Sequence, residues 1–440
     1  MHLTTTLAPI ICIAIVTLLP LAAYSSPQFS PKPGPAPPPP PQKEELAAVT
    51  SSAEHNAPSR VPAAVLAELS AGNTDFAYDL YRAIRKKSGN LCYSPFSIST
   101  AVAMIYAGAR GETERQIADA LRFTLAQDQL HPALNALGLD LDPPSPGAPV
   151  PEPGFALSIA NSIWGQVDHP FQTAYLDLLG DIYGARMGWL DFADAQQSRL
   201  TINNWVSDRT SGHIEHLIAP GILTRDTRLV LANAVYFKAE WETPFLQATR
   251  EEPFYPGDGK QVTVAMTSRR TMTGYAWGAG YQAVELRYKD ERMRMTIVLP
   301  AKGTFEEFER SLDSERMAAI TERLAREDVE LYMPKFDFAA GLDLATTLKE
   351  IGMPDAFDSG RADFSGIDGT RKLYLSAAVH KASITVDEMG TIAAAATGLG
   401  FGVESMPTEV VVDRPFIFVI RDVESGTTLF VGRVMDPSTG

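Results

Sequence analysis

Residues 387–414 read DEMGTIAAAATGLGFGVESMPTEVVVDR, and this stretch is the most informative part of the sequence about the fold. In an extended conformation its side chains alternate between two faces with period two. One face would carry Thr391, Ala393, Ala395, Thr397, Leu399, Phe401 and Val403, and the other would carry mainly alanine and glycine, from Ile392 to Glu404. Glycine is unfavourable in a settled strand because it contributes no side-chain packing. The pattern favours a segment with two states, a loose loop and an inserted strand. A plain glycine-rich loop or a short helical turn remains an alternative.

Segments before and after this stretch mix long strands with helices without strict alternation, which predicts an α+β fold. Residues 229–237, 293–299, 329–338 and 416–420 are rich in β-branched and aromatic residues, as strands are. Helical patterns cover residues 73–87, 94–109, 111–121, 202–206, 305–310 and 343–351. Asn73 is the predicted cap of the first of these helices.

The amino terminus differs in composition from the rest. Residues 7–23 form an apolar run, so residues 1–26 are predicted to be a signal peptide or a membrane anchor. Residues 27–41 contain nine prolines in fifteen positions, which predicts an extended linker over residues 27–60. The folded domain is then residues 61–440. From the first segment we expect a protein that is secreted, periplasmic or tethered to the cell surface.

Composition excludes several classes of protein. The chain has 38 Lys and Arg against 53 Asp and Glu, a net charge of −15, so nucleic acid is not an expected partner. Two cysteines, Cys12 and Cys92, exclude a disulfide framework and a cysteine-rich zinc site. No G-x-S-x-G, P-loop or H-E-x-x-H motif is present. The sequence therefore predicts no enzyme, no metal and no cofactor, although a triad of distant residues stays open.

Several motifs resemble those of one family, the serpins. The hinge signature is Glu388, Gly390 and Thr391, followed by the alanine run. Similar blocks occupy residues 90–113, 231–245, 331–336, 377–391 and 413–437, so the resemblance covers essentially all of residues 61–440. Ile392 departs from the pattern, because the family usually has Glu there. Since Ile392 lies on the second, outward face of the alternating segment, we expect insertion to tolerate it.

The resemblance implies a single α+β domain with three β-sheets, eight or nine helices and an exposed reactive-centre loop. The main sheet would accept that loop as an additional strand. The scissile bond would be Glu404–Ser405. The implied insertion hinge consists of Gly390, Thr391, Ile392, Ala393, Ala394, Ala395, Ala396 and Thr397.

Two groups of polar and aromatic residues are also implied by the resemblance. Ser94, Ser97, Asn233 and His380 match a polar cluster, the shutter, beneath the strands that must separate. Trp241, Lys335 and Glu388 match the breach, the place where insertion begins. Without the resemblance, Ser94 and Ser97 are simple helix caps and Trp241 is a core residue.

The implied function is suicide-substrate inhibition of serine endopeptidases, with cysteine endopeptidases as a second target class. Glu404 indicates a Glu-preferring target, while a shifted register would expose Val403 or Met406 instead. We expect a monomer that needs no heparin-like activator, because residues 131–139 lack a basic cluster. The alternative is a non-inhibitory serpin that acts as a carrier, a chaperone or a storage protein.

Overall fold

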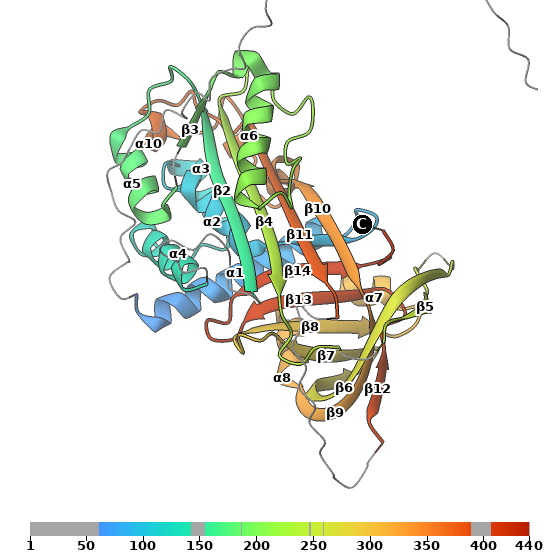
Figure 1. Ribbon diagram of the computed structural model, residues 1–440. Helices are drawn as coiled ribbons and strands as arrows, with labels where there is room; N and C mark the ends of the chain where they lie inside the picture. Colours follow the sequence, from blue (N-terminus) through green and yellow to red (C-terminus); the bar gives the residue numbers. More distant parts are fainter. Residues whose placement is uncertain are drawn as a thin grey trace, which may run out of the picture. The chain divides into compact units, whose positions relative to one another are not determined.

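Two β-sheets organise the computed structural model, which describes residues 61–141, 155–185, 187–245, 248–257, 259–388 and 406–439 (Figure 1). The smaller sheet has five strands in the order β10-β11-β4-β2-β3. Their bounds are β10 (Phe336–Asp343), β11 (Ala377–Val386), β4 (Leu229–Ala239), β2 (Phe155–Gln166) and β3 (Met187–Leu190). The strand pairs β4–β11 and β2–β3 are parallel, and the others are antiparallel.

The larger sheet follows the order β1-β14-β13-β8-β7-β6-β9-β12, with β5 paired to β6. It comprises β1 (Leu91–Tyr93), β5 (Arg250–Phe254), β6 (Val262–Gly278), β7 (Tyr281–Arg287), β8 (Met293–Pro300), β9 (Ala325–Pro334), β12 (Thr408–Val411), β13 (Phe416–Asp422) and β14 (Thr428–Val434). The 17-residue β6 pairs with β5 near its start and with β7 near its end. Because β6 serves both groups of strands, the second and third expected sheets form one continuous network.

Ten α-helices occur among the described residues, where eight or nine were expected. They are α1 (Ala63–Ile84), α2 (Pro95–Tyr106), α3 (Gly111–Leu121), α4 (Gln127–Leu141), α5 (Thr173–Tyr183), α6 (Ala195–Arg209), α7 (Phe305–Arg310), α8 (Ser314–Glu322), α9 (Leu344–Glu350) and α10 (Ser365–Asp368). Short 3₁₀ turns lie at Phe192–Asp194 and Asp355–Phe357. The shortest of them is the four-residue α10, and the predicted α+β class is confirmed.

Helices cover both faces of the five-stranded sheet, with α2 behind it and α6 in front (Figure 1). The main core takes alternate residues of β4, including Leu231, Val235 and Phe237. The intervening residues, such as Ala232 and Ala234, face a second cluster that includes residues of α6. Strand β4 is therefore buried on both faces, as its nearly continuous apolar sequence predicts.

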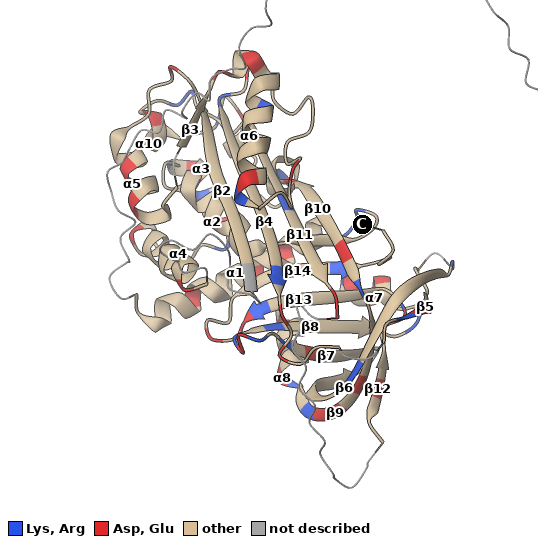
Figure 2. Cartoon of the chain, in the orientation of Figure 1, with Lys and Arg blue, Asp and Glu red and all other residues tan. Residues whose placement is uncertain are grey.

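Charged side chains are nearly absent from the middle of this sheet. Strand β2 contains none, β4 contains only Lys238 near its end, and β11 contains Lys381 opposite Ala234 (Figure 2). A strand inserted between β4 and β11 would therefore meet mostly neutral residues, with Lys381 as the charged side chain on the paired stretch.

Two predicted elements have different bounds in the structure. Helix α1 begins at Ala63, ten residues before the predicted cap Asn73. Asn73 is buried inside the helix, and its Nδ2 donates to the Thr428 carbonyl at 2.9 Å. Because the Thr428 carbonyl of β14 accepts a hydrogen bond from this amide, Asn73 does not act as a helix cap.

No helix among the described ranges is both long and apolar enough to cross a bilayer.

The predicted strand over residues 329–338 is in fact two strands in two sheets. Strand β9 ends at Pro334, which has no N–H to donate. β10 begins at Phe336, and Lys335 forms the corner between them. A periodic pattern reports alternation along a strand but cannot report that the chain changes sheets. This corner places Lys335 at the end of the five-stranded sheet.

Candidate functional site

The central strand pair, β4 and β11, is the feature on which the candidate site is built. Their parallel register runs from Ala377 opposite Val230 to Ile384 opposite Phe237. Both strands continue two residues further, to Ala239 and Val386. The pairing therefore ends before the strands end, and the pair is open at the end nearest Glu388.

This parallel pair has the polarity needed to accept a further strand. A chain that leaves β11 at Val386 and turns back runs antiparallel to β11. Because β4 is parallel to β11, the same returning chain is antiparallel to β4 as well. Insertion would require the two strands to separate by one additional strand spacing, about 4.8 Å.

A polar cluster lies beneath the middle of the pair and contains all four residues predicted for the shutter. His380 and Asn233 are directly opposite each other in the register. Ser94 and Ser97 come from the start of α2, where the Ser94 hydroxyl accepts from the Ser97 N–H at 3.2 Å. All four are almost completely buried. Asn233 Nδ2 donates to Ser97 Oγ at 2.6 Å and to the Ser97 carbonyl at 3.2 Å.

The hydrogen bonds of His380 fix its tautomer. Its Nε2 accepts from the Ser94 backbone N–H at 3.3 Å, so the proton resides on Nδ1. Nδ1 in turn donates to Asn233 Oδ1. Burial lowers the pKa of His380 from 6.5 to about 3, so the ring is neutral near pH 7. Both nitrogens are used, and one ring connects α2 with β4 and β11.

Asn161 also belongs to this cluster, although sequence reasoning missed it. It lies on β2 directly opposite Asn233, and its Oδ1 accepts from Asn233 Nδ2 and from Ser97 Oγ. Asn161, Asn233 and His380 thus form a polar row across three adjacent strands. The sequence shows a lone Asn within an apolar strand. It does not show which strands are neighbours, and the row depends on that order.

The three residues predicted for the breach meet at the open end of the pair. Lys335 Nζ lies 3.0 Å from Glu388 Oε1 and 3.2 Å from Oε2. Thr249 Oγ1 donates to Glu388 Oε1 at 2.6 Å. Although partial burial acts in the opposite direction, hydrogen bonds, including those from Thr249 and Lys335, hold the pKa of Glu388 below its ordinary value.

Hydrogen bonds to two backbone carbonyls also hold the chain at Asp387 and Glu388. Trp241 Nε1 donates to the Asp387 carbonyl at 3.0 Å, and the Phe245 N–H donates to the Glu388 carbonyl at 2.7 Å. The Trp241 ring stacks on Tyr288, with centroids 4.4 Å apart. Two successive carbonyls, just before the predicted reactive segment, are therefore bound by one neighbouring segment.

A buried arginine behind Trp241 was not predicted. The Arg269 guanidinium carbon lies 4.5 Å from the centre of the Phe245 ring and 6.0 Å from that of Trp241. The guanidinium also donates to the Thr243 carbonyl. Burial lowers the pKa of Arg269 to about 10, so it remains charged near pH 7. It packs against Trp241 of the predicted breach and against Phe245.

The predicted hinge, Gly390 to Thr397, and the predicted reactive bond, Glu404–Ser405, lie outside the described residues. On the far side of that gap, Met406 is 94% exposed. The chain then enters β12, which pairs in parallel with β9 at the edge of the larger sheet. Thr408 Oγ1 donates to Glu327 Oε1 at 2.5 Å and helps to anchor this end.

These features define an α+β protein with a parallel strand pair that is open directly below Glu388 and closed over a buried polar cluster. A family model described as "Serpin (serine protease inhibitor)" matches residues 71–437. The chain belongs to the serpin family, a family of protease inhibitors rather than of catalysts.

Individual relatives agree with this assignment. A leukocyte elastase inhibitor of Equus caballus is 36% identical over 385 residues and covers 84% of this chain and 100% of its own length. An uncharacterized serpin-like protein of Thermococcus kodakarensis is 37% identical over 372 residues, covering 83% of this chain and 85% of its own. The crystal structure of uncleaved ovalbumin has a TM-score of 0.75 at 25% identity, covering 84% of this chain and all of that chain.

The comparisons overturn the predicted location. We expected a secreted, periplasmic or surface-tethered protein because of the N-terminal segment alone. The family match begins only at residue 71. Leukocyte elastase inhibitors of Equus caballus and Sus scrofa match along their entire length, yet cover 84% of this chain. The segment on which the location rested has no counterpart in these relatives, and the prediction is wrong.

Proposed function

We propose that this protein is a suicide-substrate inhibitor of serine endopeptidases, with cysteine endopeptidases as a second target class. The observation that carries the proposal is the parallel pair β4–β11, whose pairing stops two residues short of the strand ends beside Glu388. A segment that follows Glu388 could enter there with the correct polarity for both neighbours. The buried polar cluster would serve as the latch that keeps the pair closed until insertion.

In the proposed reaction, the protease attacks the Glu404 carbonyl carbon. The bond to the Ser405 nitrogen breaks, Ser405 leaves as a new amino terminus, and an acyl-enzyme remains on Glu404. Residues 391–404 then insert between β4 and β11. Since a strand advances about 3.3 Å per residue, these fourteen residues carry the acyl group by about 45 Å. The displaced protease would be distorted before water can release it.

The driving force would come from new backbone pairing and from apolar burial. Leu399, Phe401 and Val403 share one face of the proposed strand, and each contributes about 1.5–3 kcal/mol if fully buried. The uncleaved fold would then be held by a kinetic barrier rather than by the lowest free energy. Breaking the polar cluster and the contacts of Glu388 would be part of that barrier.

For the target we propose an endopeptidase that prefers Glu, because Glu404 would occupy its primary pocket. Relatives named leukocyte elastase inhibitor support adding an elastase to the proteases tested, since Val403 lies one residue away. The inhibitor would act as a monomer, without a heparin-like activator. The division of the chain into residues 1–26, 27–60 and a folded domain of residues 61–440 remains a prediction.

The test is to incubate the full chain with a Glu-specific endopeptidase, an elastase, a chymotrypsin-like protease and a papain-like protease. We expect a complex with one of them that survives denaturing electrophoresis, and a released fragment that begins at Ser405. Turnover without a stable complex would favour the carrier, chaperone or storage alternative. No cleavage between Phe401 and Met406 would refute the proposed reactive bond.

A further inference from the structure

One buried side chain, Arg269 of β6, contacts alternate residues of the segment that connects β4 with β5. Its guanidinium donates to the Thr243 carbonyl. The guanidinium carbon also lies 6.0 Å from the centre of the Trp241 ring and 4.5 Å from that of Phe245. Because these contacts reach three residues of a five-residue stretch, Arg269 restrains the whole of residues 241–245.

The same stretch binds the chain just before the predicted reactive segment. The Trp241 indole donates to the Asp387 carbonyl at 3.0 Å, and the Phe245 N–H donates to the Glu388 carbonyl at 2.7 Å. Arg269 contacts both residues that make these bonds. It therefore acts on residues 387 and 388 through Trp241 and Phe245.

A buried charge is not what packing alone would place here. Arg269 is 5% exposed, and its Nε has no hydrogen-bond partner among the described residues. Within the same part of the chain it forms no ion pair with a carboxylate. Burying a charge without an acidic partner is costly, and an apolar residue of similar size would fill the space at a lower cost. The arginine therefore points to a role beyond filling space.

We propose that Arg269 is a positioning residue that slows the opening of the strand pair β4–β11. It keeps Trp241 and Phe245 in the conformation that binds the two carbonyls. The chain that inserts must turn back shortly after Glu388, so these bonds have to loosen before it can enter the pair. The inference rests on the proposed function, since it concerns the insertion step.

The test measures insertion without a protease. A fluorescein-labelled peptide of residues 391–404 is incubated with the intact full chain, and the fraction of protein that carries peptide is followed by gel filtration. Arg269→Met keeps a side chain of similar length without the charge. Incorporation should be about tenfold faster than in wild type, since a desolvated cation over aromatic rings contributes enough free energy to change a rate by that factor.

Two further substitutions of the same residue separate charge from size. Arg269→Gln is neutral but polar, and it should be as fast as the Met variant. Arg269→Lys keeps a cation near the Phe245 ring, so its rate should lie closer to that of wild type. Urea unfolding of each variant shows that the proteins compared are folded.

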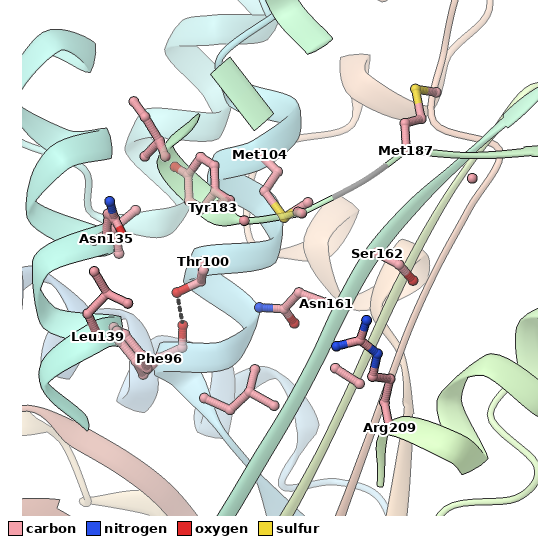
Figure 3. Close-up of a pocket in the computed structure, with 18 of the residues that line it drawn as sticks. Phe96, Thr100, Met104, Asn135, Leu139, Asn161, Ser162, Tyr183, Met187 and Arg209 are labelled. Carbon is pink, nitrogen blue, oxygen red and sulfur yellow. Dashed lines mark hydrogen bonds between the residues drawn. The ribbon is translucent and has the colours of Figure 1, made fainter. Parts of the chain in front are cut away.

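Two controls separate this effect from a general loss of stability. Arg270→Met alters the next residue of β6, an exposed arginine that pairs with Asp328 at 2.6 Å, and should leave incorporation unchanged. Met187, labelled in Figure 3, is a buried residue of β3, the outermost strand of the five-stranded sheet. Met187→Ala should destabilise the fold without changing incorporation. The register places Met187 level with Leu231, ten residues before Trp241, so it lies about 33 Å from the breach along β4.

Equal incorporation in wild type and in the folded neutral variants would overturn the inference and leave the proposed function standing. A Lys variant as fast as the Met variant would overturn it as well. So would faster incorporation in Met187→Ala, because the rate would then follow stability alone. No incorporation into any of these folded proteins would contradict the proposed insertion itself, and this inference with it.

Discussion

The imidazole of His380 connects three elements that strand insertion would have to separate. It accepts from α2 through Ser94 and donates to Asn233 on β4, while its own backbone belongs to β11. These bonds require the neutral ring, because Nε2 can accept only when it carries no proton. The closed state of the strand pair therefore depends on the protonation of one residue.

Acid should weaken the fold through this residue. The pKa of His380 is lowered to about 3 in the folded chain, against 6.5 when exposed, and burial lowers that of His131 to about 4. Since the folded values are depressed, stability is complete above pH 6.5 and declines as the pH falls toward 4. Each ring contributes a slope of up to about 1.4 kcal/mol per pH unit. Urea denaturation at a series of pH values measures it.

His380→Gln, which keeps a neutral polar side chain, should lose the part of the slope that one ring contributes, up to about 1.4 kcal/mol per pH unit. His131→Gln, on α4 and outside the polar cluster, should lose a similar part and is the matched control. An unchanged slope in the His380 variant would contradict the assigned cause.

The ion pair between Lys335 and Glu388 should contribute little to stability by itself. The Lys335 side chain is 35% exposed and that of Glu388 is 27% exposed, so solvent screens their attraction. A double-mutant cycle with Lys335→Met and Glu388→Gln should give a coupling energy of at most about 1 kcal/mol. Urea midpoints of the four proteins provide the measurement. A coupling of about 3 kcal/mol or more would mean that the pair is desolvated.

At the scale of elements, the two faces of the proposed inserted strand should respond differently to the same substitution. Ala393 is on the face expected to be buried, whereas Ile392 is on the outward face. Ala393→Glu should convert the inhibitor into a substrate, because a buried unpaired carboxylate costs several kcal/mol. Ile392→Glu should retain inhibition.

The number of inhibitor molecules needed to inactivate one protease molecule is the measurement for both variants. The ratio should rise severalfold or become unmeasurable for the Ala393 variant and stay near that of wild type for the Ile392 variant. The same ratio in both would show that the segment does not insert in the assumed register.

For the whole molecule, cleavage of the reactive bond should raise thermal stability. The three large apolar residues near Glu404 would together contribute roughly 5–9 kcal/mol on burial. For a domain of about 380 residues this corresponds to a Tm higher by about 6–11 °C, and new backbone pairing adds to it. Calorimetry of intact and cleaved protein checks the prediction. Equal melting temperatures would argue for a non-inhibitory serpin.

Most individual elements were predictable because their signals are local. Ser94 followed by Pro95 starts α2 where expected, and α3 and α7 have the predicted bounds. Lys335 was predicted within a strand, yet it lies at a corner, since a pattern of alternation continues across a change of sheet. Asn161 and Arg269 were missed because each acts through neighbours that are distant in sequence.

The α+β class, the family resemblance and the alternating pattern of residues 391–404 could be predicted without a structure, because periodicity and motifs are properties of the chain alone. The folded chain was needed to show that β4 and β11 are parallel neighbours open at one end, and that Asn161, Asn233 and His380 form one row. Strand order and register depend on contacts between residues that are far apart in the sequence, so no short stretch of residues specifies them.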